Sequence, residues 1–135
     1  MQQQMQQTLA RWHAMLEQGN FEQVESLLAE DVVFRSPVAY QPYSGKAVVA
    51  FILQNVIQIF QDFRYHRELH SQDGRHVVLE FSARVGDKTL KGIDMISIDS
   101  QGKIIDFEVM LRPKSGLEAL AAQMGKRMQA YSAPS

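Results

Sequence analysis

Residues 92–113 read GIDMISIDSQGKIIDFEVMLRP, and this stretch decides the fold of the chain. Two runs rich in β-branched and apolar residues flank Ser100-Gln101-Gly102, whose turn chemistry predicts a β-hairpin. Asp94 lies in the first run with apolar residues on both sides. An ionised carboxylate that is buried without a partner is costly, so such groups raise their pKa or perform chemistry. Asp94 is therefore the first candidate functional residue.

Strand patterns extend from this hairpin toward the N-terminus. Asp73-Gly74 and Gly86-Asp87 are turn signals, so four strands in an antiparallel meander are predicted between residues 63 and 113. Residues 32–36 are mainly β-branched and aromatic and predict one more short strand, followed by a loop over residues 37–44.

Two helices are predicted before that short strand. Apolar residues at helical spacing predict a first helix that ends at Gly19. Asn20 and Gln23 resemble a capping box, which predicts a short second helix ending near residues 30–31. The apolar residues of the first helix are Met5, Leu9, Trp12 and Leu16.

Two further helices are predicted on either side of the meander. A long apolar helix follows Ser44-Gly45, with the broad apolar face of a helix that packs on a sheet. Ser115 and Glu118 form an S-x-x-E box, which predicts a C-terminal helix over about residues 115–130.

This order of elements predicts an α+β cone-shaped fold, in which a curved, mostly antiparallel sheet is covered by three helices and followed by a C-terminal helix. Residues 1–135 are predicted to form one domain with its core at about residues 8–113. A covered, curved sheet encloses a cavity, and strand parity directs a set of apolar side chains into it beside Asp94. These pocket residues are Phe34, Ile96, Phe107, Val109 and Leu111.

Composition excludes several classes of function. The chain has 14 Lys+Arg, 15 Asp+Glu and a net charge of −1, without the basic runs of nucleic-acid binders. It has no cysteine, so disulfides and cysteine-zinc sites are excluded. Its N-terminus lacks the pattern of a signal peptide, and no stretch approaches the roughly 20 apolar residues of a membrane span. We expect a cytoplasmic protein that binds neither nucleic acid nor membranes.

The segments LEQGNFEQVESLLAEDVVFRSPVAYQPYSG and GIDMISIDSQGKIIDFEVML resemble the nuclear transport factor two-like superfamily, and within it SnoaL-like domains and ketosteroid isomerases. The likeness spans about residues 8–113. Its markers are the Gly-Asn helix end, the Leu-Leu-Ala-x-Asp-Val run, the Ser-Pro-Val loop leading to Pro-Tyr-Ser-Gly, and the paired final strands. Since this fold carries many functions, the resemblance implies the fold more than the activity.

The resemblance to ketosteroid isomerases assigns roles to three positions. Asp94 falls where those isomerases place a protonated Asp that donates to a substrate oxyanion. Ser36 falls where they have an Asp general base, and a serine without an adjacent base cannot abstract a carbon-bound proton. Trp12 falls where they have an oxyanion-binding Tyr, and an indole donates one N–H but is not an acid. The comparison thus implies a proton-transfer set reduced to Asp94, in a pocket that Trp12 and Ser36 also line.

Three other residues are candidates for the site. His13 follows Trp12 on the first helix and is a candidate general base, with a place at the edge of the helix-sheet contact as the alternative. Tyr40 and Tyr43 lie in the loop after the short strand, where they either cap the pocket mouth or pack within the loop.

The remaining candidate residues are predicted to lie on the surface of the sheet. His66, Glu68 and His70 alternate along one predicted strand, so they share a face that could hold a metal. Without a fourth ligand of defined spacing, a solvated or dimer-facing surface is the preferred reading, and no metal or cofactor is predicted. Met110 and Arg112 have the opposite parity to the pocket residues, which predicts a homodimer through the open face of the sheet.

Two kinds of function follow from this reading. The first is proton transfer of the isomerase, cyclase or dehydratase type on a small carbonyl compound, with Asp94 as the acid and His13 or a bound water as the base. The alternative is a non-catalytic domain that binds a small apolar molecule or acts as a dimerising accessory protein. The first requires a second titratable group near the substrate.

Overall fold

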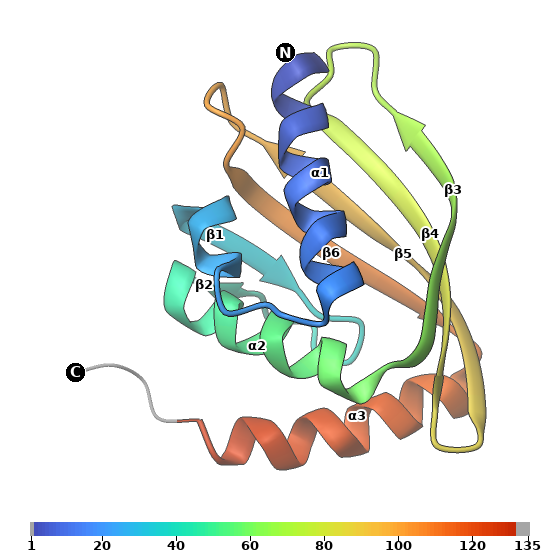
Figure 1. Ribbon diagram of the computed structural model, residues 1–135. Helices are drawn as coiled ribbons and strands as arrows, with labels where there is room; N and C mark the ends of the chain where they lie inside the picture. The colour runs from blue at the N-terminus through green and yellow to red at the C-terminus, as the bar shows by residue number, and fades with distance from the viewer. Residues whose placement is uncertain (1, 132–135) are drawn as a thin grey trace.

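A curved sheet of six strands, in the order β2-β1-β6-β5-β4-β3, forms the body of the molecule. The structure is a computed structural model that describes residues 2–131 (Figure 1). Neighbouring strands are antiparallel except β1 and β6, which run parallel. The strands are β1 (Leu28–Arg35), β2 (Tyr43–Ser44), β3 (Gln61–His70), β4 (His76–Val85), β5 (Lys88–Ile98) and β6 (Ile104–Arg112).

Three α-helices accompany this sheet in the described part of the chain: α1 (Gln2–Gln18), α2 (Lys46–Ile59) and α3 (Lys114–Gln129). Helices α1 and α2 lie against the concave face, and α3 runs below α2 (Figure 1). The predicted α+β fold, with a mostly antiparallel sheet and a C-terminal helix, is therefore confirmed. No described helix is long and apolar enough to cross a membrane.

Helix α1 ends as its sequence predicts. Gly19 has φ +65°, its N–H donates to Leu16 O, and Asn20 N–H donates to Met15 O. This pair of bonds is the Schellman arrangement that a left-handed glycine allows. The meander of four strands is confirmed as well, and its three connections each contain a glycine with positive φ.

The predicted second helix is wrong beyond its first turn. Val24–Leu27 is a single 3-10 turn, and β1 begins at Leu28 rather than Val32. Leu28 is aligned with Ile104 in the parallel β1–β6 pair, so pairing across the sheet overrides the local helical pattern. Asn20 accepts the N–H of Glu22 within a turn instead of forming the predicted capping box.

The predicted C-terminal helix is confirmed within one residue at each end, but the S-x-x-E box does not cap it. Pro113 occupies the N-cap without a side-chain bond, so Ser115 lies inside α3 rather than before it. Packing fixes this start, because a Cβ on Gly116 would lie 2.7 Å from the Cβ of Leu90. The first residues of α3 are thereby held close against β5.

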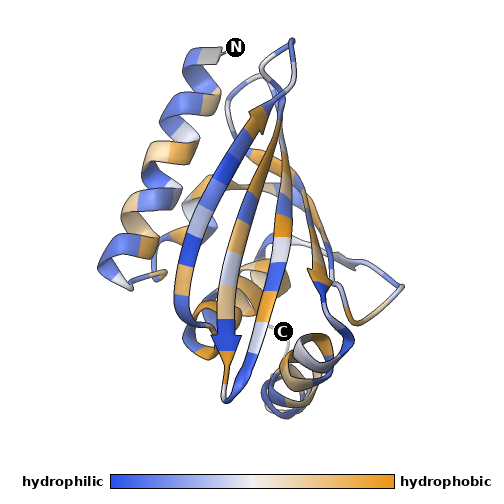
Figure 2. Cartoon of the chain, turned by 90° about the vertical axis from the view of Figure 1, so that its right-hand side faces the viewer, coloured by the Kyte–Doolittle hydropathy of each residue, from blue (hydrophilic) through white to orange (hydrophobic). Residues whose placement is uncertain are grey.

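The two faces of the sheet differ in character. Leu79, Asp94 and Val109 are aligned across β4, β5 and β6, and side chains aligned in this way share a face, here the one that the helices cover. On the opposite face, Arg67 and Lys91 contact the carboxylate of Glu80, and the hydrogen bond from Arg67 is the main reason that its pKa falls to about 2. The edge strand β3 carries mostly hydrophilic residues, as Figure 2 shows.

Gly92 leaves space for two large side chains on the covered face. It is aligned with Phe81 and Leu111 on the neighbouring strands. A Cβ on Gly92 would collide with the carbonyl oxygen of Met110 and with the side chains of Leu111 and Phe81. Close packing therefore requires glycine at this position.

We predict that Gly92→Ala destabilises the fold by about 1–3 kcal/mol, the usual cost of an extra methyl group in a filled core. The shift of the urea midpoint measures this cost. Gly125→Ala is the matched control, because a Cβ there meets nothing within 4 Å and alanine favours a helix. A Gly92→Ala variant as stable as the native chain would contradict the packing argument.

Candidate functional site

A cavity of about 200 Å³ lies between the covered face of the sheet and the helices. Its walls are mainly apolar, and Asp94 is the one carboxylate among the residues that line it. The lining residues come from α1, the β1–β2 region, α2, β3, β6 and α3 as well as β5. An apolar hollow with few polar groups is the usual form of a small-molecule site.

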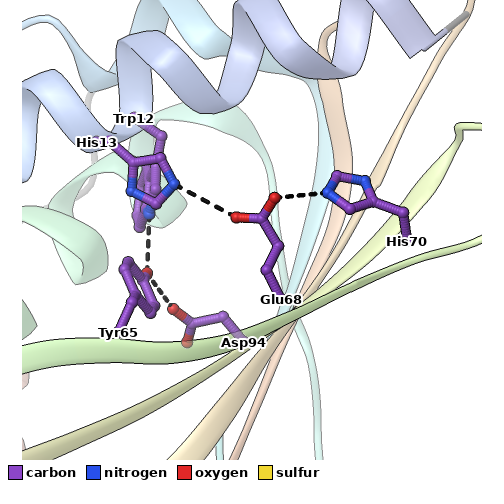
Figure 3. Close-up of polar contacts among 6 residues, drawn as sticks. All are labelled: Trp12, His13, Tyr65, Glu68, His70 and Asp94. Atoms are coloured by element: carbon purple, nitrogen blue, oxygen red, sulfur yellow. Dashed lines mark hydrogen bonds and ion pairs between the residues drawn. The ribbon is translucent and has the colours of Figure 1, made fainter.

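Asp94 is joined to α1 through a chain of two hydrogen bonds (Figure 3). The hydroxyl of Tyr65 donates to Asp94 Oδ2 at 2.6 Å, and Trp12 Nε1 donates to the Tyr65 hydroxyl at 2.9 Å. Since an indole N–H can only donate, the Tyr65 oxygen accepts there and its own hydrogen is free to point to Asp94. The structure orients this chain from Trp12 through Tyr65 to Asp94, and the indole fixes the direction of its first bond.

Burial makes Asp94 a neutral acid at moderate pH. The residue is 6% exposed, and burial raises its pKa from 3.8 to about 7, against a smaller lowering effect of the Tyr65 hydrogen bond. Burial, followed by the charge of Asp94, raises the pKa of Tyr65 well above its usual range. Tyr65 therefore keeps its hydrogen over the pH range in which Asp94 titrates.

The direction of the chain also assigns the proton of Asp94 to one oxygen. Oδ2 accepts from Tyr65, and among residues 2–131 no hydrogen bond is made to Oδ1. Asp94 lines the cavity, and Oδ1 is the carboxyl oxygen that Tyr65 does not contact, so Oδ1 is the oxygen placed to meet a bound molecule. Neutral Asp94 thus carries its proton on Oδ1, where it can donate to a bound oxygen.

Several of the residues expected in the pocket do line this cavity. Asp94 shares its walls with six of them: Trp12, Phe34, Ser36, Tyr43, Phe107 and Val109. Ser36 Oγ accepts the N–H of Val38, which leaves the Ser36 hydrogen free to donate.

Three expected pocket residues do not line it. Ile96 is 1% exposed and is packed in the core between the strands that carry Val77 and Phe107. Leu111 occupies the space left by Gly92. Tyr40 is 99% exposed, so the expectation that it caps the pocket is wrong.

His13 also lies outside the cavity lining. One residue after Trp12, it is turned by about 100° around the helix and so faces the edge of the sheet. Its Nε2 lies 3.8 Å from Glu68 Oε1, and its ring meets the Tyr65 ring edge-on at 5.3 Å between centroids (Figure 3). His70 Nε2 approaches the other Glu68 oxygen at 2.6 Å. The predicted general base is therefore part of a half-exposed cluster.

The three alternating residues of β3 do not share one face. The register of β3 against β4 shifts between Tyr65 and Glu68. His66 therefore turns to the uncovered face and contacts Ser82 Oγ at 2.7 Å, while Glu68 and His70 lie on the covered side. A β-bulge thus separates His66 from the other two.

Tyr65 is the functional residue that the sequence reading missed. The alternation of Phe63 and Tyr65 at the start of β3 was the available signal for a strand side chain that faces the core. Its bond to Asp94 crosses from β3 over β4 to β5, a contact that alternation alone does not specify.

We predict that Asp94→Asn becomes more stable than the native chain as the pH rises. Native Asp94 keeps its proton up to about pH 7, whereas the unfolded chain releases it near 3.8, so the native chain loses stability between these values. The variant does not titrate there, and the difference in unfolding free energy should grow to about 4 kcal/mol, at 1.36 kcal/mol per pKa unit. Urea unfolding of both proteins at several pH values measures it. A difference independent of pH would show that Asp94 is not protonated by burial.

Comparisons with known proteins agree with this architecture. The SnoaL-like domain family matches residues 9–107. A steroid delta-isomerase from Pseudomonas aeruginosa is 54% identical, with 95% of this chain and 93% of that chain covered and a TM-score of 0.92. An uncharacterized protein with a cystatin-like fold from Silicibacter pomeroyi is 37% identical, over 90% of this chain and 85% of that chain, with a TM-score of 0.84.

A more distant structure shows the shared fold alone. The epoxide hydrolase/cyclase-like enzyme SalBIII, which has a role in pyran ring formation in salinomycin, is 16% identical over 86% of this chain and 97% of that chain, with a TM-score of 0.69. No curated protein matches the chain significantly. From the family match and the two close structures, the chain belongs to the SnoaL-like domain family.

Proposed function

We propose that this protein is an isomerase-type enzyme that binds a small, mainly apolar carbonyl compound and moves a proton next to its carbonyl group. The observation that carries the proposal is Asp94, a neutral acid whose Oδ1 opens into an apolar cavity. A carboxylic acid that donates to a carbonyl oxygen stabilises the negative charge that develops there during enolisation. Trp12 and Tyr65 hold that acid in one orientation.

The size of the cavity limits the substrate. An apolar cavity of about 150 Å³ is known to hold benzene. A cavity of about 200 Å³ therefore suits a compound of one or two rings. The likeness to a steroid delta-isomerase supports the reaction type, whereas the cavity volume favours a smaller carbonyl compound than a steroid.

The proton acceptor in this proposal is water. The cavity lining holds Tyr43 and Tyr65 besides Asp94 as titratable groups, and a phenol is a poor base at neutral pH. Asp94 gives its proton to the carbonyl oxygen while a water molecule beside the substrate takes the proton of the neighbouring C–H. Return of a solvent proton to carbon and of the enol proton to Asp94 then completes the cycle. The hydroxyl of Ser36 can position that water, since its hydrogen is uncommitted.

A second candidate function is non-catalytic binding of the same kind of compound. It is favoured by the position of His13, which lies outside the cavity lining, so that among residues 2–131 the phenols of Tyr43 and Tyr65 are the other titratable groups beside Asp94. The experiment that tests the enzyme proposal must therefore measure binding of the compound and its turnover separately.

We propose further that the chain forms a homodimer through the uncovered face of the sheet. Met95 is 39% exposed, Met110 is 46% exposed, and Leu69 on the same face is 63% exposed. The charged pair Arg35–Asp106 lies on the same face. Apolar residues next to complementary charges suit a second copy that meets this face by twofold symmetry.

The enzyme proposal is tested with 1-tetralone, a two-ring ketone with acidic hydrogens beside its carbonyl. In D₂O the protein should accelerate deuterium incorporation at that carbon, measured by mass spectrometry. The rate should fall as the pH rises through about 7, because Asp94 then loses its proton. Asp94→Asn keeps a donor but cannot transfer a proton, and we expect a loss of roughly 100-fold, as for a general acid.

The outcomes separate the two functions. Binding of 1-tetralone without deuterium incorporation would replace the enzyme proposal by the second candidate. No preference of the protein for 1-tetralone over tetralin, which lacks the carbonyl oxygen, would contradict both.

The dimer proposal predicts a two-chain species in sedimentation at micromolar protein. Met110→Lys places an unpaired charge at the centre of the face and should shift the protein to monomer. Tyr40→Lys is the matched control, since it puts the same charge on an exposed residue of the β1–β2 loop. A native chain that sediments as a monomer would contradict the proposal.

A further inference from the structure

Two of the residues that line the cavity are also exposed to solvent. Val38, in the loop between β1 and β2, and Gly125, on α3, are the two residues that both line the cavity and are exposed. The other lining residues are buried or half-buried. We propose that these two residues form the mouth of the cavity and that Gly125 is the position that determines which size of carbonyl compound enters, an inference that rests on the function proposed above.

Neither the backbone nor the packing of α3 requires glycine at position 125. Its φ is not positive, unlike that of the turn glycines such as Gly19 and Gly102. A Cβ on Gly125 would meet nothing within 4 Å, whereas a Cβ on Gly116 of the same helix would press on Leu90. Glycine inside a helix is less favourable than alanine. The helix therefore gives no structural reason for glycine at this position, which lines the cavity and has open space beside it for a side chain.

The width of the mouth is held by contacts between α3 and α2. Arg127 Nη1 donates to Asn55 Oδ1 at 3.0 Å and to Gln58 Oε1 at 2.6 Å. The rings of Phe51 and Tyr131 also meet, with centroids 4.5 Å apart. Arg127 and Tyr131 flank Met128, which lines the cavity. Their contacts with α2 therefore hold this part of α3 over the cavity. The side chain at position 125, rather than movement of the helix, then sets the free opening.

The fluorescence of Trp12 can be used to measure access through the mouth. It is the only tryptophan of the chain, it is 4% exposed, and it lines the cavity. Its fluorescence therefore reports both the entry of a ketone and the access of acrylamide, a small neutral quencher.

The test compares Gly125→Leu with Ala122→Leu, a matched change at an exposed residue of α3 outside the cavity lining. Stopped-flow fluorescence measures the association of 1-tetralone and of the smaller 2-cyclohexen-1-one. We expect Gly125→Leu to slow the association of 1-tetralone by at least about tenfold and that of 2-cyclohexen-1-one by less than about threefold. Ala122→Leu should change neither rate.

Acrylamide quenching of Trp12 tests the mouth without any ketone. Gly125→Leu should lower the quenching constant relative to the native chain and to Ala122→Leu, with no loss of thermal stability. If the native chain binds neither ketone, the proposed function fails, and the quenching result still decides whether the mouth lies at Gly125. Unchanged quenching in Gly125→Leu would overturn the mouth, and an equal effect on both ketones would overturn the size selection.

Discussion

An indole N–H can only donate a hydrogen bond, and this restriction orders the chemistry of the whole cavity. Trp12 donates to the hydroxyl of Tyr65, and Tyr65 in turn donates to Asp94 Oδ2. Asp94 is left with Oδ1 as the oxygen that carries its proton. Burial then keeps that proton in place up to about pH 7. A single donor on α1 thus converts a buried carboxyl group, which would otherwise only destabilise the fold, into an oriented acid.

The fold brings these three residues together from distant parts of the chain. Trp12 lies on α1, Tyr65 on the edge strand β3 and Asp94 two strands further on in β5. The curved sheet turns β3 toward α1, as Figure 1 shows, which lets one tyrosine bridge the helix and the strand. Gly92 contributes by leaving room for Phe81 and Leu111 beside this bridge. The acid is therefore positioned by packing over the whole covered face.

Much of this could be predicted from local patterns, and the rest depends on contacts between distant residues. Asp94 was recognisable because alternation along a strand assigns a side chain to one face, and the apolar residues around it marked that face as buried. The hydrogen bond between Tyr65 and Asp94 could not be predicted in this way, because it reaches from β3 over β4 to β5. The bulge in β3 likewise escapes a reading by strict alternation, so His66 was placed with Glu68 and His70 although it faces the other way. Capping patterns failed where pairing or packing decided the boundary, as at Leu28.

Burial is what makes Asp94 a neutral acid. The most direct test is a carboxyl ¹³C NMR titration of the native protein, with the Asp94 resonance assigned by its absence in Asp94→Asn. The account predicts a pKa of about 7, far above the ordinary value of 3.8. Titration at or below that ordinary value would show an ionised, partnered carboxylate and would remove the acid on which the proposed chemistry depends.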